Sequence, residues 1–345
     1  MHQITTGIVG YGMSGRYFHL PPLINHPNFK IKSIMTRSEH NQSDLRDQFP
    51  AIEIVTSFHD LIEDPEIELI VIATSNDVHY SYTKEALLHG KHVVCEKPFV
   101  DSYTKAKELF DLAAEKKLIL RVFHNRRYDG DLLTIKKLLD TKDFGQLISF
   151  TCRFDRFAPK IGSNWRDQVD PMSGVYYDLA PHLVHHAVEL FGLPEFVQNT
   201  LFDDREHTEV DDHFEMTLYY KQMTVFLGAH MFERDPKPRF EVIGTKATYV
   251  KYGFDDPDAV HEATDQVYQN SGLRSELITS PGQKQAIPLL LGEHYRFYDL
   301  IAHHIDEYPE EDHDKSYALS VILLMQLGLV SHQTKQMIKV PHKDL

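Results

Sequence analysis

The strongest constraint on the fold is a glycine pattern near the amino terminus. Gly10, Gly12 and Gly15 form GxGxxG between the apolar run 6–9 and a stretch with helical spacing. In this context the first glycine permits a tight turn, the second lets the backbone approach a pyrophosphate, and the third allows close packing of helix on strand. The expected phosphate contacts are Gly10, Gly12, Met13, Ser14 and Gly15. A glycine-rich turn without a ligand is the alternative.

Strand and helix patterns alternate over the first third of the chain. Short apolar runs, typical of buried parallel strands, recur at 6–9, 31–35, 52–55, 69–73, 92–95 and 118–123. Stretches with helical spacing lie between them, for example residues 102–117. Repeated units of this kind predict an α/β domain with a doubly wound parallel sheet. Residues 1–123 are therefore expected to bind a dinucleotide.

The pattern changes after a helical segment near 131–139, because strands then follow one another. Residues 214–220 and 225–231 alternate apolar with polar side chains, as in a sheet with one wetter face. Further strand candidates are 147–156, 196–202, 239–243 and 247–252. The run 255–285 is predicted to be a long excursion, and 293–307 and 317–338 return to helical spacing. Residues 124–345 are thus expected to form an α+β domain with an open, mainly antiparallel sheet.

Composition narrows the class of partner and the compartment. The 345 residues carry 51 acidic and 36 basic side chains, a net charge of -15, which disfavours nucleic acid and anionic membranes. A small molecule is the expected partner. The two cysteines, Cys95 and Cys152, cannot build a disulfide framework or a four-cysteine zinc site. No stretch approaches 18 apolar residues and no leader pattern precedes the first strand, so we expect a soluble, cytoplasmic protein.

The end of the second predicted strand indicates the preferred dinucleotide. NAD-preferring folds usually place an acidic side chain there, which binds the ribose hydroxyls. This chain has Thr36, Arg37 and Ser38 instead. An arginine with hydroxyl neighbours suits a ribose 2′-phosphate, so NADP is favoured over NAD. The alternative is an exposed arginine on a turn, with Glu39 reaching back to the ribose.

Glu96, Lys97 and Pro98 follow a predicted parallel strand, at the carboxyl edge where such sheets bind ligands. A lysine at this place can lie between a nicotinamide ring and a substrate and donate hydrogen bonds to the reacting oxygen. Taken alone, a lysine in a turn is more often simply solvated.

Asp178 and His182 are four residues apart, which on a helix places them on one face. A carboxylate beside an imidazole can orient it and raise its pKa, which suits proton transfer near neutral pH. Two alternatives stay open. Asp178 can be a plain helix cap, since Pro181 suits only a first turn. His182 and His186 can bind a metal, although no third ligand is evident, so no metal is expected.

Together these motifs resemble the Gfo/Idh/MocA family, the glucose-fructose oxidoreductase and inositol dehydrogenase type. The resemblance spans nearly the whole chain. Besides the glycine pattern it rests on residues 73–79, the EKP at 96–98, Asn125-Arg126-Arg127, Trp165-Arg166 and the DxxxH at 178–182. Three segments, FHNRRYDGDLLTIKKLL, GVYYDLAPHL and YVKYG, are most similar to NADP-dependent scyllo-inositol dehydrogenase-like members.

The resemblance implies a Rossmann domain, a C-terminal sheet that often serves in oligomer contacts, and hence a homodimer or homotetramer. It implies that Lys97 polarises the reacting hydroxyl, that His182 accepts its proton and that Asp178 tunes His182. Implied cofactor contacts are Thr74, Asn76, His79, Glu96, Lys97, Asn125, Trp165 and Arg166. The chain departs from the family at Pro181, where a small residue or glycine usually precedes the histidine. His19 can face the cleft or pack beneath two prolines.

The expected function is therefore an NAD(P)-dependent dehydrogenase or reductase acting on a secondary alcohol, CH-OH, of a polyol or sugar, with scyllo-inositol as one candidate. Three alternatives are retained. The same scaffold can use bound NAD for elimination or glycoside cleavage. It can sense the cofactor without catalysis. A metal-dependent dehydrogenation is the third.

Overall fold

The computed structural model describes residues 3–162, 165–235, 237–254, 274–309 and 312–342. The chain forms two compact units: Met1–His124 with Tyr295–Leu319, and Asn125–His294 with Ser320–Leu345. The sequence pattern assigns everything after residue 123 to the second domain, whereas 295–319 packs with the first unit. Amphipathic spacing over 293–307 predicts a helix but does not indicate which core the helix packs against.

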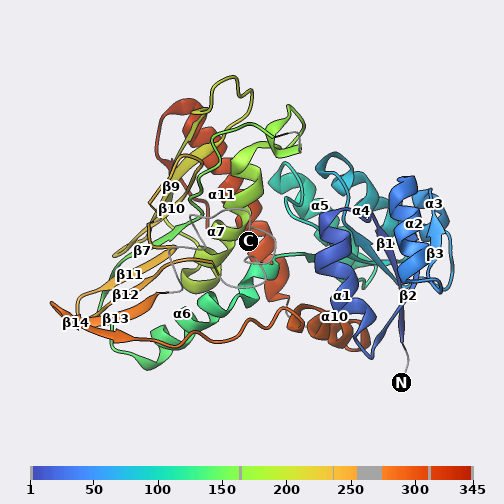
Figure 1. Cartoon of the computed structure of the whole chain (residues 1–345), viewed down its shortest axis with the longest axis horizontal. Helices are drawn as coiled ribbons and strands as arrows, with labels where there is room; N and C mark the ends of the chain where they lie inside the picture. Colours follow the sequence, from blue (N-terminus) through green and yellow to red (C-terminus); the bar gives the residue numbers. More distant parts are fainter. Residues whose placement is uncertain (1–2, 163–164, 236, 255–273, 310–311, 343–345) are drawn as a thin grey trace. The chain divides into compact units, whose positions relative to one another are not determined.

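The first unit is built on a six-stranded parallel sheet with helices around it (Figure 1). Its strands lie in the order β3-β2-β1-β4-β5-β6, which confirms the predicted doubly wound sheet. They are β1 (Ile4–Val9), β2 (Phe29–Met35), β3 (Glu53–Val55), β4 (Leu69–Ile72), β5 (His92–Cys95) and β6 (Leu120–Val122). Every residue of β4 is apolar and buried, because both faces of a parallel sheet are covered.

Helices follow the strands of this unit in sequence. They are a π-helical turn at Gly15–His19 that continues into α1 (Leu20–Ile24), then α2 (Glu39–Gln48), α3 (Phe58–Ile62), α4 (His79–Leu88), α5 (Tyr103–Glu115) and α10 (Arg296–Asp306). Since all six strands are parallel, the loops after β1, β2, β4 and β5 meet at one edge of the sheet. The predicted cofactor residues up to residue 97 all lie in or beside these loops.

The second unit contains a nine-stranded sheet in the order β14-β13-β12-β11-β7-β10-β9-β8-β15. Its strands are β7 (Leu147–Arg153), β8 (Phe196–Phe202), β9 (His213–Tyr219), β10 (Thr224–His230), β11 (Phe240–Gly244), β12 (Thr248–Lys251), β13 (Ser275–Ser280), β14 (Gln283–Ala286) and β15 (Ile338–Lys339). Only β7 and β10 pair in parallel, so the predicted, mainly antiparallel sheet is confirmed.

Helices α6 (Gly130–Thr141), α7 (Gly174–Phe191) and α11 (His313–Thr334) complete the described secondary structure of the second unit, and the unit boundary falls within α11. In β9, Phe214, Met216 and Leu218 are buried while their neighbours are not. Helix α7 packs on β9 and β10 on the buried side, and Figure 1 shows α7 and α11 on the same side of these strands.

The predicted excursion at 255–285 is partly a hairpin. Strands β13 and β14 pair antiparallel within it, so this part of the prediction is wrong, whereas residues 255–273 lie outside the described residues. The exposed β14 reads QKQA, and its side chains are all polar or small. An edge strand of this composition has no apolar alternation from which it can be predicted.

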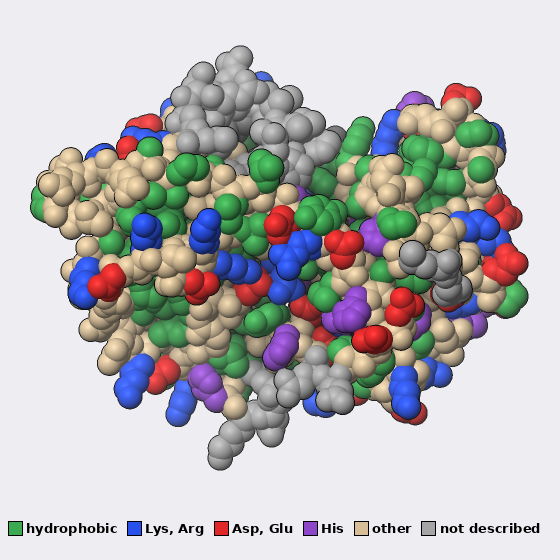
Figure 2. Space-filling model, turned by 90° about the horizontal axis from the view of Figure 1, so that it is seen from below, with side chains coloured by type: hydrophobic (Ala, Val, Ile, Leu, Met, Phe, Trp, Pro, Cys, Tyr) green, Lys and Arg blue, Asp and Glu red, His purple; other side chains and the backbone are tan. Residues whose placement is uncertain are grey.

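Acidic and basic side chains are interspersed on the face shown in Figure 2. Many exposed charges form ion pairs, such as Lys84 with Glu108 at 2.7 Å and Lys246 with Asp143 at 2.6 Å.

Within the described ranges, no helix is both long enough and apolar enough to cross a bilayer.

Candidate functional site

The glycine loop after β1 leaves open space at one position only among its three glycines. A Cβ atom on Gly10, whose φ is +103°, would lie 2.3 Å from the Ala73 carbonyl oxygen. A Cβ on Gly15 would lie 2.2 Å from the Gly10 carbonyl oxygen, whereas a Cβ on Gly12 would meet no atom within 4 Å. The fold itself therefore requires Gly10 and Gly15. No contact within the chain requires glycine at position 12. The absence of a side chain there fits a backbone that is approached by a pyrophosphate.

A Gly12→Ala variant tests this assignment. We expect it to keep the melting temperature of the wild type and to bind dinucleotide about tenfold more weakly or worse, because the methyl group occupies the space of a phosphate. Titration of NADPH fluorescence and a thermal melt measure the two properties. Gly10→Ala is the contrast, since its Cβ collides with backbone and should lower the melting temperature. Unchanged dinucleotide affinity in Gly12→Ala would contradict a phosphate contact at Gly12.

A buried carboxylate connects the glycine loop to the loop after β5. Glu96 accepts a hydrogen bond from the Ser14 hydroxyl, lies 3.1 Å from His19 Nε2 and accepts the Lys97 backbone N–H at 3.0 Å. His19 Nδ1 in turn lies 2.6 Å from the Tyr298 hydroxyl. Burial favours protonated Glu96, but His19, Lys97 and Ser14 outweigh it and lower its pKa. An ionised Glu96 thus holds the backbone that carries Lys97, and His19 is a buried link in this network.

His79 connects the loop after β4 to the same segment. Its Nδ1 is 2.8 Å from the Pro98 carbonyl oxygen and its Nε2 is 3.3 Å from the Thr74 carbonyl oxygen. The ring is fully buried, and burial lowers its pKa, so it is neutral at physiological pH. Thr74 and Asn76, predicted to contact the cofactor, are half-buried beside it. A neutral imidazole carries a single N–H, and the shorter contact assigns it to Nδ1, which donates to the Pro98 carbonyl oxygen and so binds the segment that contains Lys97.

Arg37 lies exposed at the end of β2, and its Nε donates to the Thr56 carbonyl oxygen at 3.2 Å. Thr36 is buried before it. The Ser38 hydroxyl caps α2 and accepts the Asn41 backbone N–H at 3.4 Å. An exposed guanidinium beside the carboxyl end of β2 is compatible with a bound phosphate, and the contact stays a prediction.

Asp178 and His182 lie one turn apart within α7, and both are 5% exposed. The Asp178 carboxylate accepts a hydrogen bond from Arg166 Nε at 2.6 Å. The alternative that Asp178 caps the helix is wrong, because α7 begins at Gly174 and Pro181 lies in its interior. Proline is best tolerated in the first turn of a helix, so the sequence pattern predicts a later start for α7 than the structure shows.

The actual cap of α7 is Asp211, which is distant in sequence. Its carboxylate accepts the Tyr176 N–H at 2.6 Å and its backbone carbonyl accepts the Val175 N–H at 2.9 Å. A Cβ on Gly174 would lie 2.2 Å from the Asp211 carboxylate, so glycine is needed for this approach. Burial raises the pKa of Asp211 to about 7. No local pattern reveals the cap, because it comes from the loop before β9.

Trp165 and Arg166 form a short 3-10 turn, Trp165–Asp167, and both are half-buried. The Arg166 guanidinium lies 4.9 Å from the centre of the Trp165 ring, a cation–π geometry. Asn125 begins another 3-10 turn, Asn125–Tyr128, and is half-buried.

Within the described residues, His182 and His186 do not converge with a third ligand-type side chain, as the metal alternative would require. Burial lowers the pKa of His186 to about 3, and its Nδ1 lies 3.8 Å from Cys152 Sγ. In the part of the chain that the structure describes, the three ligand-type side chains that do converge are Asp204, His213 and His230.

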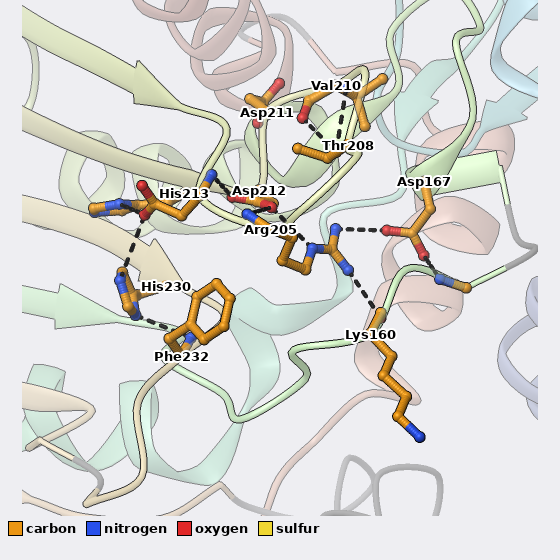
Figure 3. Close-up of polar contacts among 12 residues, drawn as sticks. Lys160, Asp167, Arg205, Thr208, Val210, Asp211, Asp212, His213, His230 and Phe232 are labelled. Carbon is orange, nitrogen blue, oxygen red and sulfur yellow. Dashed lines mark hydrogen bonds and ion pairs between the residues drawn. The ribbon is translucent and has the colours of Figure 1, made fainter.

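Hydrogen bonds and ion pairs connect the three side chains of this cluster with their neighbours (Figure 3). His230 Nδ1 accepts the Phe232 backbone N–H at 3.0 Å, so its proton is on Nε2, which faces Asp204 at 3.7 Å. His213 lies between Asp204 and Glu215, at 2.8 and 3.4 Å. Burial opposes its protonation, but the two carboxylates outweigh burial and raise its pKa.

Comparison with known proteins shows that a known family model matches residues in each of the two units. The family model described as "Oxidoreductase family, NAD-binding Rossmann fold" matches residues 4–124, and the GFO/IDH/MocA C-terminal domain matches residues 132–250. The chain belongs to the Gfo/Idh/MocA family. This family membership makes it an oxidoreductase-family protein with an NAD(P)-binding fold.

Relatives of this Gfo/Idh/MocA chain match over nearly full length. The uncharacterised oxidoreductase YdgJ of Escherichia coli (strain K12) is 35% identical over 95% of this chain and 96% of its own. The scyllo-inositol 2-dehydrogenase (NADP(+)) IolW of Bacillus subtilis (strain 168) is 30% identical over 98% and 96%. Among solved structures, the oxidoreductase yvaA of Bacillus subtilis superposes with a TM-score of 0.89 at 29% identity, covering 98% and 100%.

Proposed function

We propose that this chain transfers a hydride between a nicotinamide dinucleotide, with NADP favoured over NAD, and a secondary alcohol of a polyol or sugar. The observation that carries the proposal is the arrangement of the loops at the carboxyl ends of the strands in the first unit. There the loop bearing Lys97 is fixed by Glu96 and His79, beside the open backbone of Gly12. The similarity to IolW supports scyllo-inositol as one candidate substrate and NADP as the cofactor.

The proposed chemistry divides among a few side chains. When bound, the nicotinamide ring supplies the hydride acceptor or donor. During oxidation the alcohol carbon loses a hydride and its hydroxyl loses a proton. His182 accepts that proton, and the Lys97 ammonium stabilises the developing negative charge on oxygen. Asp178 orients and tunes His182, while its hydrogen bond from Arg166 fixes the carboxylate. Gly10, Gly12, Gly15 and Arg37 hold the dinucleotide phosphates.

A panel of inositols, other polyols and sugars with NADP and NAD, followed by nicotinamide absorbance, tests the proposal. Reduction of NADP by at least one polyol or sugar is the expected result. Product formed without a net change in cofactor redox state would favour elimination or glycoside cleavage. Dinucleotide binding without turnover of any compound would favour a sensor. Loss of activity with a chelator would favour a metal-dependent reaction.

The choice of NADP over NAD is tested at Arg37. We expect Arg37→Ala to weaken NADPH binding by about tenfold or more and NADH binding much less, because only NADPH has a 2′-phosphate for the guanidinium. Dissociation constants from fluorescence titration give both values. Arg46→Ala is the matched control, since Arg46 is an exposed arginine on the adjoining helix α2 that bonds to Gln42. Equal losses for the two dinucleotides would exclude a 2′-phosphate contact.

The polyol or sugar substrate, the cytoplasmic location and the homodimer or homotetramer stay predictions. Both cysteines are buried free thiols.

A further inference from the structure

The loop between β8 and β9 has the sequence DDREHTEVDD, which by itself is typical of a solvated acidic surface loop. In the structure three of its side chains are anchors. The Arg205 side chain is 4% exposed and that of Asp212 is fully buried. Asp211 caps α7, as described above. Buried charges are costly unless they are paired, so these contacts indicate that the loop has a structural task.

Arg205 is fixed first by its own loop. The Asp212 carboxylate accepts Arg205 Nε, the Arg205 backbone N–H and the Asp204 backbone N–H, all at 2.9 Å. These three bonds satisfy one buried carboxylate and fix the plane of the guanidinium. Its two terminal nitrogens remain directed at another part of the second unit (Figure 3).

Those terminal nitrogens bind both ends of the segment 160–167. Nη2 donates to Asp167 Oδ1 at 2.6 Å, and Nη1 donates to the Lys160 carbonyl oxygen at 3.3 Å. The other oxygen of Asp167 accepts the Gly162 backbone N–H at 2.8 Å. One guanidinium therefore binds both Lys160 and Asp167, and the Asp167 carboxylate also binds Gly162. Figure 3 shows Arg205 between Lys160, Asp167 and Asp212.

The segment 160–167 carries two predicted site residues. Trp165 and Arg166 directly precede Asp167, and Arg166 Nε binds the Asp178 carboxylate at 2.6 Å. We propose that Arg205 is a positioning residue: by closing the segment 160–167 it sets Trp165 and Arg166 in place and thereby orients Asp178, which is next to His182 on α7. The effect on catalysis rests on the proposed function, whereas the effect on Trp165 does not.

The planar guanidinium is essential to this role. Arginine offers five donors in a fixed fork and so binds three acceptors in different directions, while a lysine ammonium on a flexible stem does not reproduce that geometry. Both Arg205→Lys and Arg205→Gln should therefore release the segment, although Arg205→Lys keeps the charge.

Trp165 is the only tryptophan of the chain, so its fluorescence reports directly on the segment. We expect red-shifted emission and stronger acrylamide quenching in Arg205→Gln and Arg205→Lys. Asp167→Asn should produce a similar change, and adding it to Arg205→Gln should change little further, because both remove the same contact. Arg153→Gln is the matched control. Arg153 is a half-buried arginine of the same unit bound to Asp155 and Glu215, at 2.6 Å each, and its loss should leave the emission unchanged.

Circular dichroism and thermal melts accompany these measurements. If Arg205→Gln does not fold, Arg205→Lys and Asp167→Asn carry the test. A folded variant that loses the Arg205–Asp167 contact but keeps wild-type emission and quenching would overturn the proposal. Emission changes of the same size in Arg153→Gln would also overturn it, because they would reflect general loosening.

The kinetic arm separates this inference from the proposed function. If the wild type oxidises a polyol, the Arg205 variants should lose about tenfold to a hundredfold in kcat, in line with misplaced catalytic groups, and Arg153→Gln should not. Unchanged kcat alongside released Trp165 would overturn the orientation of Asp178 through this segment. If no polyol is oxidised by any form, the proposed function fails, while the fluorescence result still decides the role of Arg205.

Discussion

Replacement of His182 by alanine should lower kcat for polyol oxidation by about a hundredfold or more, with dinucleotide affinity unchanged. A positioned proton acceptor contributes about a hundredfold to ten-thousandfold to such a reaction. His182 lies on α7 with Asp178 one turn before it, and both are buried. Stopped-flow absorbance at the nicotinamide band gives the rate, and fluorescence titration gives the affinity.

The matched control for His182 is His185→Gln. His185 is a buried histidine on the same helix whose Nδ1 lies 3.6 Å from Glu189, and its replacement should leave kcat within a fewfold of wild type. Lys97→Met should reproduce most of the loss seen in His182→Ala, because it removes the positive charge that stabilises the alkoxide. Near-normal turnover in His182→Ala with normal NADPH binding would remove His182 from the mechanism.

Asp131→Asn should lower the free energy of unfolding by about 3–5 kcal/mol, which is the cost of leaving a buried ion pair without one partner. Asp131 is fully buried, and its Oδ2 lies 3.0 Å from Arg239 Nε and 3.1 Å from Lys251 Nζ. Both cations are also buried. Asparagine keeps the shape but not the charge, so two buried cations lose a shared carboxylate, while Arg239 keeps its ion pair with Asp129 at 3.1 Å. Urea denaturation of both proteins measures the difference.

The contribution of Asp131 to the free energy of unfolding should depend on pH, and the sign of this dependence follows from its pKa. Burial opposes ionisation of Asp131, but Arg239 and Lys251 outweigh it and lower its pKa to about 2. A carboxyl whose pKa is lower in the folded state stabilises the protein above the unfolded pKa, and this stabilisation is lost as pH falls from about 4 through 2. Wild type should lose stability over this window more steeply than Asp131→Asn.

Asp143→Asn controls for the simple loss of an acidic group. Asp143 pairs with Lys246 at 2.6 Å, but both side chains are more than 60% exposed, and such pairs contribute little. We expect its free energy of unfolding to stay within about 0.5 kcal/mol of wild type. Comparable losses in the two variants would show that Asp131 is not a special buried anchor.

Most of the fold was predictable because its local patterns are strong. The parallel strands are short and centred on apolar residues, most clearly in β4, and the strands around 214–220 and 225–231 alternate as half-buried strands do. The pairing of β13 with β14 was missed, since β14 is an exposed edge strand without apolar alternation. The packing of 295–319 with the first unit was also hidden, because amphipathicity predicts a helix but not its partner.

The candidate site was predictable only in its local motifs. The glycine pattern, Lys97 and the pair Asp178–His182 have recognisable spacing in the chain. The residues that hold them do not: Asp211 is 37 residues from the glycine it approaches at the start of α7, and Arg205 lies in a run that is typical of solvated loops. Tertiary contacts of this kind leave no periodicity, so only the folded structure reveals them.

The loop after β5 is held by hydrogen bonds to two buried side chains, those of Glu96 and His79. The loop after β2 is different, because the hydrogen bond that the structure shows for the Arg37 side chain is a surface one. Substitution of the exposed residues Arg37 and Ser38 should therefore leave the segment around Lys97 undisturbed. If the proposed 2′-phosphate contact at Arg37 is correct, coenzyme preference can be altered at the protein surface without any change to the buried hydrogen bonds beside Lys97.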